Sequence, residues 1–249
     1  MTTPHRLANL YDAHHQRHME DLPFWLELAR NADGPILELG CGTGRILLPL
    51  LNKGYQVFGL DRDADMLAVL HAKSVSAKIP APILQADMAA FLFRQSFSLI
   101  ILPCNTLSTL ENTDRLSMLD LVAYHLTPGG IFAASIPNPR LLSNLPTQVD
   151  PEIEENFPHP LDNTLVQVSS AWEHDNENFT LFWHYNHLLA NDTQERLTAT
   201  SRHLLTPSTQ IITEIEAAGL NLLHQYGDFN RRPFTRRSRD LIIIAQKPV

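Results

Sequence analysis

Three alternating glycines, Gly40, Gly42 and Gly44, constrain this chain more than any other feature of its sequence. They follow an apolar run at residues 35–39 and precede a second one at residues 46–51. A strand, a glycine turn and a helix in this order begin an α/β nucleotide site. Because glycine lacks a Cβ atom, the turn can adopt positive φ, and a ligand can lie against the N–H groups of the first helical turn. The pattern predicts a ligand with an anionic or hydrogen-bond-accepting end.

Two common phosphate sites do not fit this turn. The dinucleotide fingerprint requires glycine or alanine where this chain has Arg45, and the phosphate loop of nucleotide hydrolases requires Gly-Lys-Ser/Thr, which is absent. A tight turn that binds no ligand remains the alternative, because a glycine motif alone constrains function loosely.

The composition predicts one α/β domain with an insertion or cap. Of the 249 residues, 44% are hydrophobic and 18% are charged, which is enough to build a substantial core. No apolar run approaches the length of a membrane span and no targeting segment is recognisable, so we expect a soluble cytoplasmic protein that does not bind membranes. The two cysteines, Cys41 and Cys104, lack the spacing of a disulfide framework or a metal site.

The charge balance argues against nucleic acid as a partner. The formal net charge is -8 at pH 7, which opposes a broad basic surface. The arginine run at residues 231–239 is the exception. It could hold an anionic substrate, but a solvated loop is the commoner role of such a run.

Residues 1–34 are predicted to form an N-terminal arm followed by a helix. The helix begins near residue 21, has proline in its first turn, and covers the ligand edge of the first strand. The arm is polar and lacks helical periodicity. We expect its histidines to be surface residues and assign no metal to them: His5, His14, His15 and His18.

Acidic residues end the next two predicted strands. Residues 55–60 form a buried strand that ends at Asp61, and residues 83–85 form a short strand that ends near Asp87. In a parallel sheet Asp61 lies beside the glycine turn and can accept hydrogen bonds from both hydroxyls of a ribose; a helix cap is the alternative role. Asp87 can accept from the exocyclic amine of a purine, while the Met88 N–H donates to the ring.

Three segments, at residues 38–44, 59–61 and 85–88, resemble in order and spacing the first three cofactor motifs of class I S-adenosylmethionine-dependent methyltransferases. The resemblance covers residues 35–136 almost throughout. It implies a doubly wound, Rossmann-like α/β fold with a seven-stranded sheet, in which residues 207–249 complete the domain and the last strand is antiparallel.

The resemblance also implies roles for individual residues. The three glycines would lie alongside the methionine part of S-adenosylmethionine. Asp61 would bind its ribose and Asp87 its adenine, and Glu38 would order the turn. Tyr11 would close over the cofactor, as an N-terminal tyrosine does in some members. The candidate cofactor-binding residues are Tyr11, Glu38, Gly40, Cys41, Gly42, Gly44, Asp61, Arg62, Met66, Asp87, Met88 and Pro103.

The tip of the fourth strand, Pro103-Cys104-Asn105, is where this family usually meets its substrate. It lacks the Asn/Asp-Pro-Pro-aromatic motif of enzymes that methylate DNA amines or protein glutamine, and the acidic cluster of the magnesium-dependent catechol type. Pro103-Cys104 is similar to the Pro-Cys pair of cytosine C5-methyltransferases, but a small apolar residue is the commoner role for Cys104. Asn105 is a candidate substrate residue.

Residues 137–206 are predicted to form an inserted antiparallel lid for substrate binding or dimerisation. After a proline-rich acidic crossing, strand-like runs occupy residues 164–172, 178–190 and 195–205, with hairpin-like turns at 174–176 and 191–192. The insertion resembles those of glycine N-methyltransferase-like and aminosugar N-methyltransferase-like enzymes. Its candidates are His184 and Tyr185 for catalysis, and Trp172, Trp183 and Arg202 for substrate contact.

We therefore expect a methyltransferase that passes a methyl group from S-adenosylmethionine to a nitrogen or oxygen of a small molecule by in-line displacement, without a metal. S-adenosylhomocysteine would be the second product, and the protein would be a monomer or homodimer. Two alternatives stay open. One is an S-adenosylmethionine-binding sensor or partner subunit without transferase activity. The other is a methyltransferase of tRNA or another nucleic acid, which depends on the arginine run alone.

Overall fold

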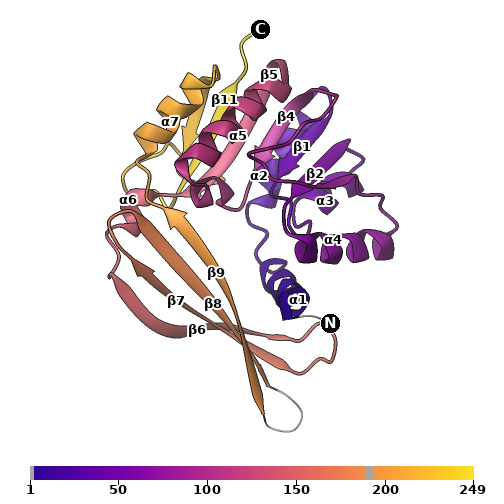
Figure 1. Cartoon of the computed structure of the whole chain (residues 1–249), viewed down its shortest axis with the longest axis vertical. Coiled ribbons are helices and arrows are strands. Elements are labelled where there is room, and N and C mark those ends of the chain that lie inside the picture. The colour runs from indigo at the N-terminus through magenta and orange to yellow at the C-terminus, as the bar shows by residue number, and fades with distance from the viewer. Residues whose placement is uncertain (1–2, 189–192) are drawn as a thin grey trace.

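A computed structural model of the chain describes residues 3–188 and 193–249 (Figure 1). Seven strands form one sheet in the order β10-β11-β5-β4-β1-β2-β3, and four form a separate sheet in the order β6-β7-β8-β9. Strands β1 to β5 run parallel to one another, whereas β11 is antiparallel to both of its neighbours, β5 and β10. The predicted Rossmann-like sheet with an antiparallel last strand is confirmed.

The strand order brings the predicted motifs to one edge of the large sheet. The carboxyl ends of β1, β2 and β4 are neighbours, with Leu39 of β1 paired to Leu60 of β2. The glycine turn therefore lies beside Asp61 and beside the tip of β4. The strands are β1 Ile36–Leu39, β2 Val57–Asp61, β3 Ile83–Gln85, β4 Phe97–Leu102, β5 Leu126–Pro137, β10 Asn221–Tyr226 and β11 Asp240–Gln246.

Helices cover both faces of the large sheet. On one face α2 (Leu22–Arg30), α3 (Leu47–Asn52) and α4 (Ala64–Ala77) pack around Trp25, Leu47 and Leu70. On the other, α5 (Asn112–His125) and α7 (Ser208–Ala217) pack around Met118, Leu119 and Ile215. Two short helices, η1 (Thr106–Thr109) and α6 (Pro139–Leu142), follow β4 and β5.

The second sheet is inserted between β5 and α7 and has one strand more than predicted. It consists of β6 (Gln148–Pro158), β7 (Leu165–His174), β8 (Asn178–Leu188) and β9 (Gln194–Leu204). Its antiparallel pairing is confirmed, whereas β6 was expected to be an irregular crossing. Its prolines are tolerated because it is an edge strand whose register shifts twice. The turn predicted at residues 191–192 lies outside the described residues.

The predicted N-terminal arm is a helix, α1 (Thr3–His15). Its apolar residues are few, but Leu7 and Leu10 pack on Phe157, Val166 and Tyr185 of the inserted sheet. Tertiary packing therefore supplies what the sequence periodicity lacks. Figure 1 shows α1 between the inserted sheet and the α4 side of the large sheet.

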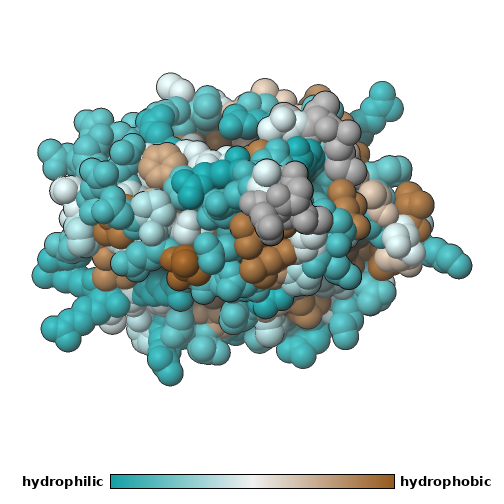
Figure 2. Space-filling model, turned by 90° about the horizontal axis from the view of Figure 1, so that it is seen from below, coloured by the Kyte–Doolittle hydropathy of each residue, from teal (hydrophilic) through white to brown (hydrophobic). Residues whose placement is uncertain are grey.

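The end of the molecule that carries the inserted sheet is mainly hydrophilic, with separate hydrophobic patches (Figure 2). Exposed large apolar residues of the insertion include Leu141, Ile153, Leu161, Leu165 and Leu188. Among the described residues, the helices are all too short or too polar to cross a membrane.

Candidate functional site

The glycine turn after β1 presents bare backbone. Gly40, Gly42 and Gly44 have φ values of 66°, 51° and 82°, a region that other residues rarely adopt. A Cβ atom built on Gly42 would meet only the Asp61 Oδ2 atom, at 3.9 Å, so the space above this residue is open. Gly44 differs, because its Cβ would lie 3.0 Å from Leu70 Cγ. The turn therefore faces open space at its middle and packs on α4 at its end.

Asp61 ends β2 and points at the turn. Its Oδ2 atom accepts from the Gly42 N–H at 2.7 Å, and its Oδ1 atom accepts from the Asp63 N–H at 2.9 Å. Burial raises the pKa of Asp61, although these two hydrogen bonds oppose the rise. Each carboxylate oxygen keeps a lone pair for a further donor. The helix α4 is capped by Asp63 instead, which leaves Asp61 available to a ligand.

Glu38 lies beneath the turn with an unsatisfied atom. The residue is 2% exposed, and its Oε2 atom has no hydrogen-bond partner among the described residues. Burial raises the pKa of Glu38 well above its ordinary value. A buried polar atom without a partner is costly, so Glu38 is a group that a bound ligand could satisfy.

The β3 tip supplies the next two predicted residues. Asp87 is exposed and accepts from the Ala89 N–H at 2.8 Å. Met88 is half-buried, and its Cε atom would lie 3.4 Å from a Cβ on Gly40. Met88 therefore flanks the glycine turn.

The remaining predicted residues near β2 have different surroundings. Cys41 is buried and its Sγ atom packs on Gly59, so its side chain supports the turn from inside. Arg62 is exposed, and Met66 is half-buried in the first turn of α4.

An ion-paired network beside the turn was not predicted. Arg45 donates to both carboxylate oxygens of Asp21, at 2.5 and 2.7 Å, and its Nη2 atom lies 2.9 Å from Cys104 Sγ. Asp21 also accepts from Trp25 Nε1 at 2.9 Å. The network links α2, the glycine turn and the β4 tip. Its only signal in the sequence is that an arginine follows the third glycine directly.

Helix α1 is fastened over the turn. Lys73 of α4 donates to Asp12 Oδ1 at 2.6 Å and to the Thr43 carbonyl at 2.9 Å. Tyr11, on the same turn of α1, stacks on His15 with a ring-centroid distance of 3.8 Å. Tyr11 is half-buried. Its burial raises the pKa of its hydroxyl above the ordinary value, and the nearby Cys104 adds a smaller rise.

The β4 tip has two consecutive residues in a left-handed conformation. Cys104 and Asn105 have φ values of 60° and 62°. Such strain in residues other than glycine is common at ligand sites. Pro103 is buried behind them, while Cys104 is exposed and Asn105 half-buried. The structure thus brings Pro103, Asn105, Tyr11 and the glycine turn into one region.

The candidates of the inserted sheet fall on two faces. Trp183 and Tyr185 face α1: Tyr185 is fully buried, its hydroxyl lies 3.2 Å from His14 Nδ1, and Trp183 contacts His14 edge-on. Trp172 shares this inner face through its pairing with Leu181. His184 lies on the opposite face, 2.9 Å from Thr198 Oγ1.

Arg202 also lies on the outer face of the inserted sheet, at its α5 end. It is half-exposed, donates to Asn178 at 2.9 Å and pairs with Glu111 at 2.9 Å. The structure therefore separates His184 and Arg202 from the face that α1 covers.

Part of the arginine run binds its own domain. Arg231 pairs with Glu27 at 3.1 Å, and its guanidinium lies over the rings of Phe24 and Tyr226. This residue is held by α2 and β10 and is less available to a nucleic acid.

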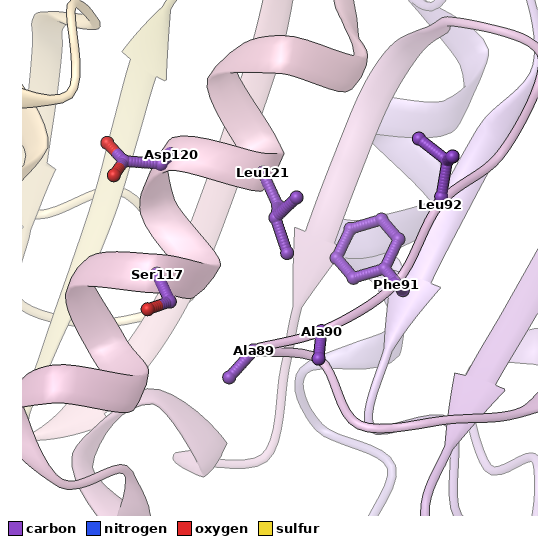
Figure 3. A pocket seen from close by; sticks show the side chains of 7 residues that line it. All are labelled: Ala89, Ala90, Phe91, Leu92, Ser117, Asp120 and Leu121. Carbon is purple, nitrogen blue, oxygen red and sulfur yellow. The ribbon is translucent and has the colours of Figure 1, made fainter.

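Two surface pockets lie elsewhere. Figure 3 shows a shallow pocket of about 520 Å³ between the loop after β3 and helix α5. A second pocket, of about 360 Å³, lies at the β3 edge. Neither is lined by the glycine turn, Asp61 or Cys104. We therefore locate the candidate site by the functional groups around the glycine turn and not by the position of these pockets. Lining residues of the first pocket are Ala89, Ala90, Phe91, Leu92, Ser117, Asp120 and Leu121.

Residues 36–130 match the family described as "Methyltransferase domain". A Bacillus subtilis protein that bears the name methyltransferase YqeM is 35% identical over 109 residues, which are 43% of this chain and 44% of that protein. The chain thus matches less than half of the length of that relative. The cypemycin N-terminal methyltransferase of a Streptomyces species is 22% identical over 228 residues, which are 90% of this chain and 87% of that protein.

Solved structures share the whole fold. An S-adenosylmethionine-dependent methyltransferase from Clostridium acetobutylicum has a TM-score of 0.80 at 16% identity, with 98% of each chain covered. The sugar N-methyltransferase KedS8 from Streptoalloteichus has a TM-score of 0.74 at 18% identity, with 96% of this chain and 93% of that chain covered. At these identities the likeness concerns the fold, including the inserted sheet.

Proposed function

We propose that this chain is a class I S-adenosylmethionine-dependent methyltransferase that transfers a methyl group to a nitrogen or oxygen of a small molecule, since residues 36–130 match the methyltransferase-domain family and a solved methyltransferase shares the fold. The observation that carries this proposal is the open backbone at Gly42 beside the Asp61 carboxylate. An unsatisfied Glu38 atom beneath the turn and a strained, accessible β4 tip beside it add support.

The residues present fit the cofactor. Gly40 and Gly42 would lie alongside its amino-acid part, Asp61 would accept hydrogen bonds from the ribose hydroxyls, and Met88 would contact the adenine. Tyr11 would cover the site from α1. When bound, S-adenosylmethionine supplies a methyl group on a sulfonium, which needs no further activation.

The protein would act by aligning the acceptor with the methyl group and by excluding water from the site. Helix α1, tied to α4 by the Asp12–Lys73 pair, covers the turn, and the inner face of the inserted sheet covers α1. Holding two reactants in line removes most of the entropic cost of their reaction. Burial raises the pKa of Tyr185 above its ordinary value, and its hydroxyl lies 3.2 Å from His14 Nδ1, so Tyr185 would hold α1 in place and would not act as a general base.

A small-molecule acceptor has support from two similar proteins. One is named for the N-terminus of cypemycin and the other for sugar N-methylation. The net charge of -8 and the engagement of Arg231 with its own domain favour such an acceptor over a nucleic acid. A panel of aminosugars and of peptides with free N-termini, assayed by release of S-adenosylhomocysteine, is the direct test of the acceptor class.

Replacing Asp61 by alanine is expected to weaken binding of S-adenosylmethionine and S-adenosylhomocysteine by about 1–3 kcal/mol, because a carboxylate that accepts hydrogen bonds is lost. Titration calorimetry on the native and variant chains measures this. The matched control is Asp63→Ala, which removes a neighbouring carboxylate that caps α4 and should leave affinity unchanged. Absence of binding to the native chain would contradict the proposed function.

Replacing His184 by alanine is expected to leave turnover unchanged, because this side chain lies on the outer face of the inserted sheet. Trp183→Ala, on the inner face, is expected to raise the acceptor KM roughly tenfold through lost aromatic contact. Steady-state kinetics with an acceptor from the panel distinguish the two. A tenfold fall in kcat for the His184 variant would return that residue to the mechanism.

A further inference from the structure

Three metal-ligating side chains meet between α1 and β6. His14 lies in the last turn of α1, His18 follows three residues after the helix ends, and Glu155 of β6 faces both. The Glu155 Oε1 atom is 3.3 Å from His14 Nε2 and 3.1 Å from His18 Nε2. The three ligand atoms all lie within 4.8 Å of one another. Two imidazoles thus converge on a single carboxylate oxygen.

These separations suit a tetrahedral metal ion. With bonds of about 2.0–2.1 Å, neighbouring ligand atoms around Zn²⁺ are about 3.3–3.4 Å apart. The separations of 3.3 and 3.1 Å between Glu155 Oε1 and the two histidine nitrogens fall close to this value. Two histidines and one carboxylate also form a donor set that zinc accepts, with one position left open.

The groups behind these ligands hold them in place. His14 was expected at the surface but is 1% exposed, because α1 packs on the inserted sheet, and its second ring nitrogen, Nδ1, lies 3.2 Å from the buried Tyr185 hydroxyl. The second oxygen of Glu155, Oε2, accepts from Arg17 Nε at 2.8 Å. Metal-ligating histidines and carboxylates commonly have such outer partners, which fix their orientation. His18 is half-exposed, so the open position faces solvent.

We propose that His14, His18 and Glu155 bind one zinc-type divalent ion that fastens α1 to the inserted sheet. The ion would lie one turn of α1 from Tyr11 and Asp12, which cover the glycine turn, with His15 stacked on Tyr11 between them. Binding would therefore hold the cover of the cofactor site closed. Sequence spacing predicts no metal here, because Glu155 lies 137 residues along the chain from His18.

A second group of similar type requires its own control. His159, Asp162 and His187 also bring their ligand atoms within 4.8 Å of one another. Here, however, Asp162 is exposed on a turn, and the His187 Nε2 atom is already 2.5 Å from Thr164 Oγ1. It is therefore the weaker candidate.

The test is titration calorimetry of the full chain, free of any histidine tag and treated with a chelator, with ZnCl₂ as the probe. We expect one ion per chain and a dissociation constant of about 10 µM or tighter. Cobalt(II) should give the absorption bands of a tetrahedral site. His18→Ala and Glu155→Gln are each expected to weaken binding by at least about tenfold, and Tyr185→Phe, which removes only an outer partner, by roughly 10- to 100-fold.

His224→Ala is the matched control, because this exposed histidine belongs to neither group, and it should leave affinity unchanged. His18 is half-exposed, so its replacement should not affect folding, which circular dichroism verifies. Binding weaker than about 10 µM to the native chain would overturn the proposal. So would tight binding that persists in His18→Ala and disappears in Asp162→Asn.

Discussion

Replacing Glu214 by alanine is expected to lower the free energy of unfolding by about 3–5 kcal/mol, because it leaves the buried charge of Arg115 without its partner. Arg115 of α5 is 0% exposed, and its side chain faces Glu214 of α7. Its Nε and Nη2 atoms donate to the two oxygens of Glu214 at 2.6 and 2.9 Å. Urea unfolding followed by circular dichroism measures the loss.

The matched control is Glu216→Ala on the same helix, where the side chain is exposed and the expected change is within about 0.5 kcal/mol. The pair can also be removed together. Arg115→Met combined with Glu214→Leu should recover most of the stability, since well-packed apolar residues commonly replace a buried ion pair without loss. A double variant no more stable than Glu214→Ala would mean that packing, and not the unpaired charge, causes the loss.

The same pair makes stability depend on pH. Burial by itself would raise the pKa of Glu214, but the hydrogen bonds from Arg115 and Gln210 outweigh it, so the folded-state pKa lies below its ordinary value. A depressed carboxyl pKa stabilises the fold above the unfolded-state pKa, and the stabilisation disappears as the pH falls through the folded-state pKa. The acid-induced loss should be smaller in the double variant.

Replacing Trp25 by alanine is expected to cost about 3–5 kcal/mol of unfolding free energy, because the side chain is 0% exposed and its removal leaves a cavity. Trp25 packs against Phe24 and Phe229 at centroid distances of 5.2 and 6.1 Å. Its Nε1 atom also donates to Asp21, the residue that holds Arg45 beside the glycine turn. Loss of the ring should therefore also weaken cofactor binding in the folded variant.

Trp25→Phe distinguishes the two contributions. It keeps most of the apolar volume and removes the N–H donor, so a smaller loss of about 1–2 kcal/mol is expected. Thermal unfolding and titration with S-adenosylhomocysteine measure stability and affinity on the same samples. An equal loss in both variants would assign the effect to the hydrogen bond.

The large sheet and the glycine turn were predictable because their signals are local. Gly40, Gly42 and Asp61 follow apolar strands directly, and parallel strands bring their carboxyl ends to one edge. The Arg45–Asp21 pair was not predictable, because it joins residues 24 positions apart with no fixed spacing rule.

Two elements were missed for a different physical reason. Helix α1 has a weak apolar stripe, and its stability depends on Leu10 meeting Tyr185 of β8. Strand β6 contains prolines and acidic residues that disfavour a strand in isolation, yet β7 pairs with it along most of its length. In both cases contacts between distant segments override local preference.

The unusual composition of β6 disfavours strand pairing between copies of this protein at the edge of the inserted sheet. An uncovered edge strand is a template for strands of other molecules, and this is a route to aggregation. Pro151 offers no N–H group to an incoming strand, the two register shifts break the ladder, and Glu152 and Glu154 are exposed charges. Addition of a strand from another molecule at this edge of the inserted sheet is thereby disfavoured.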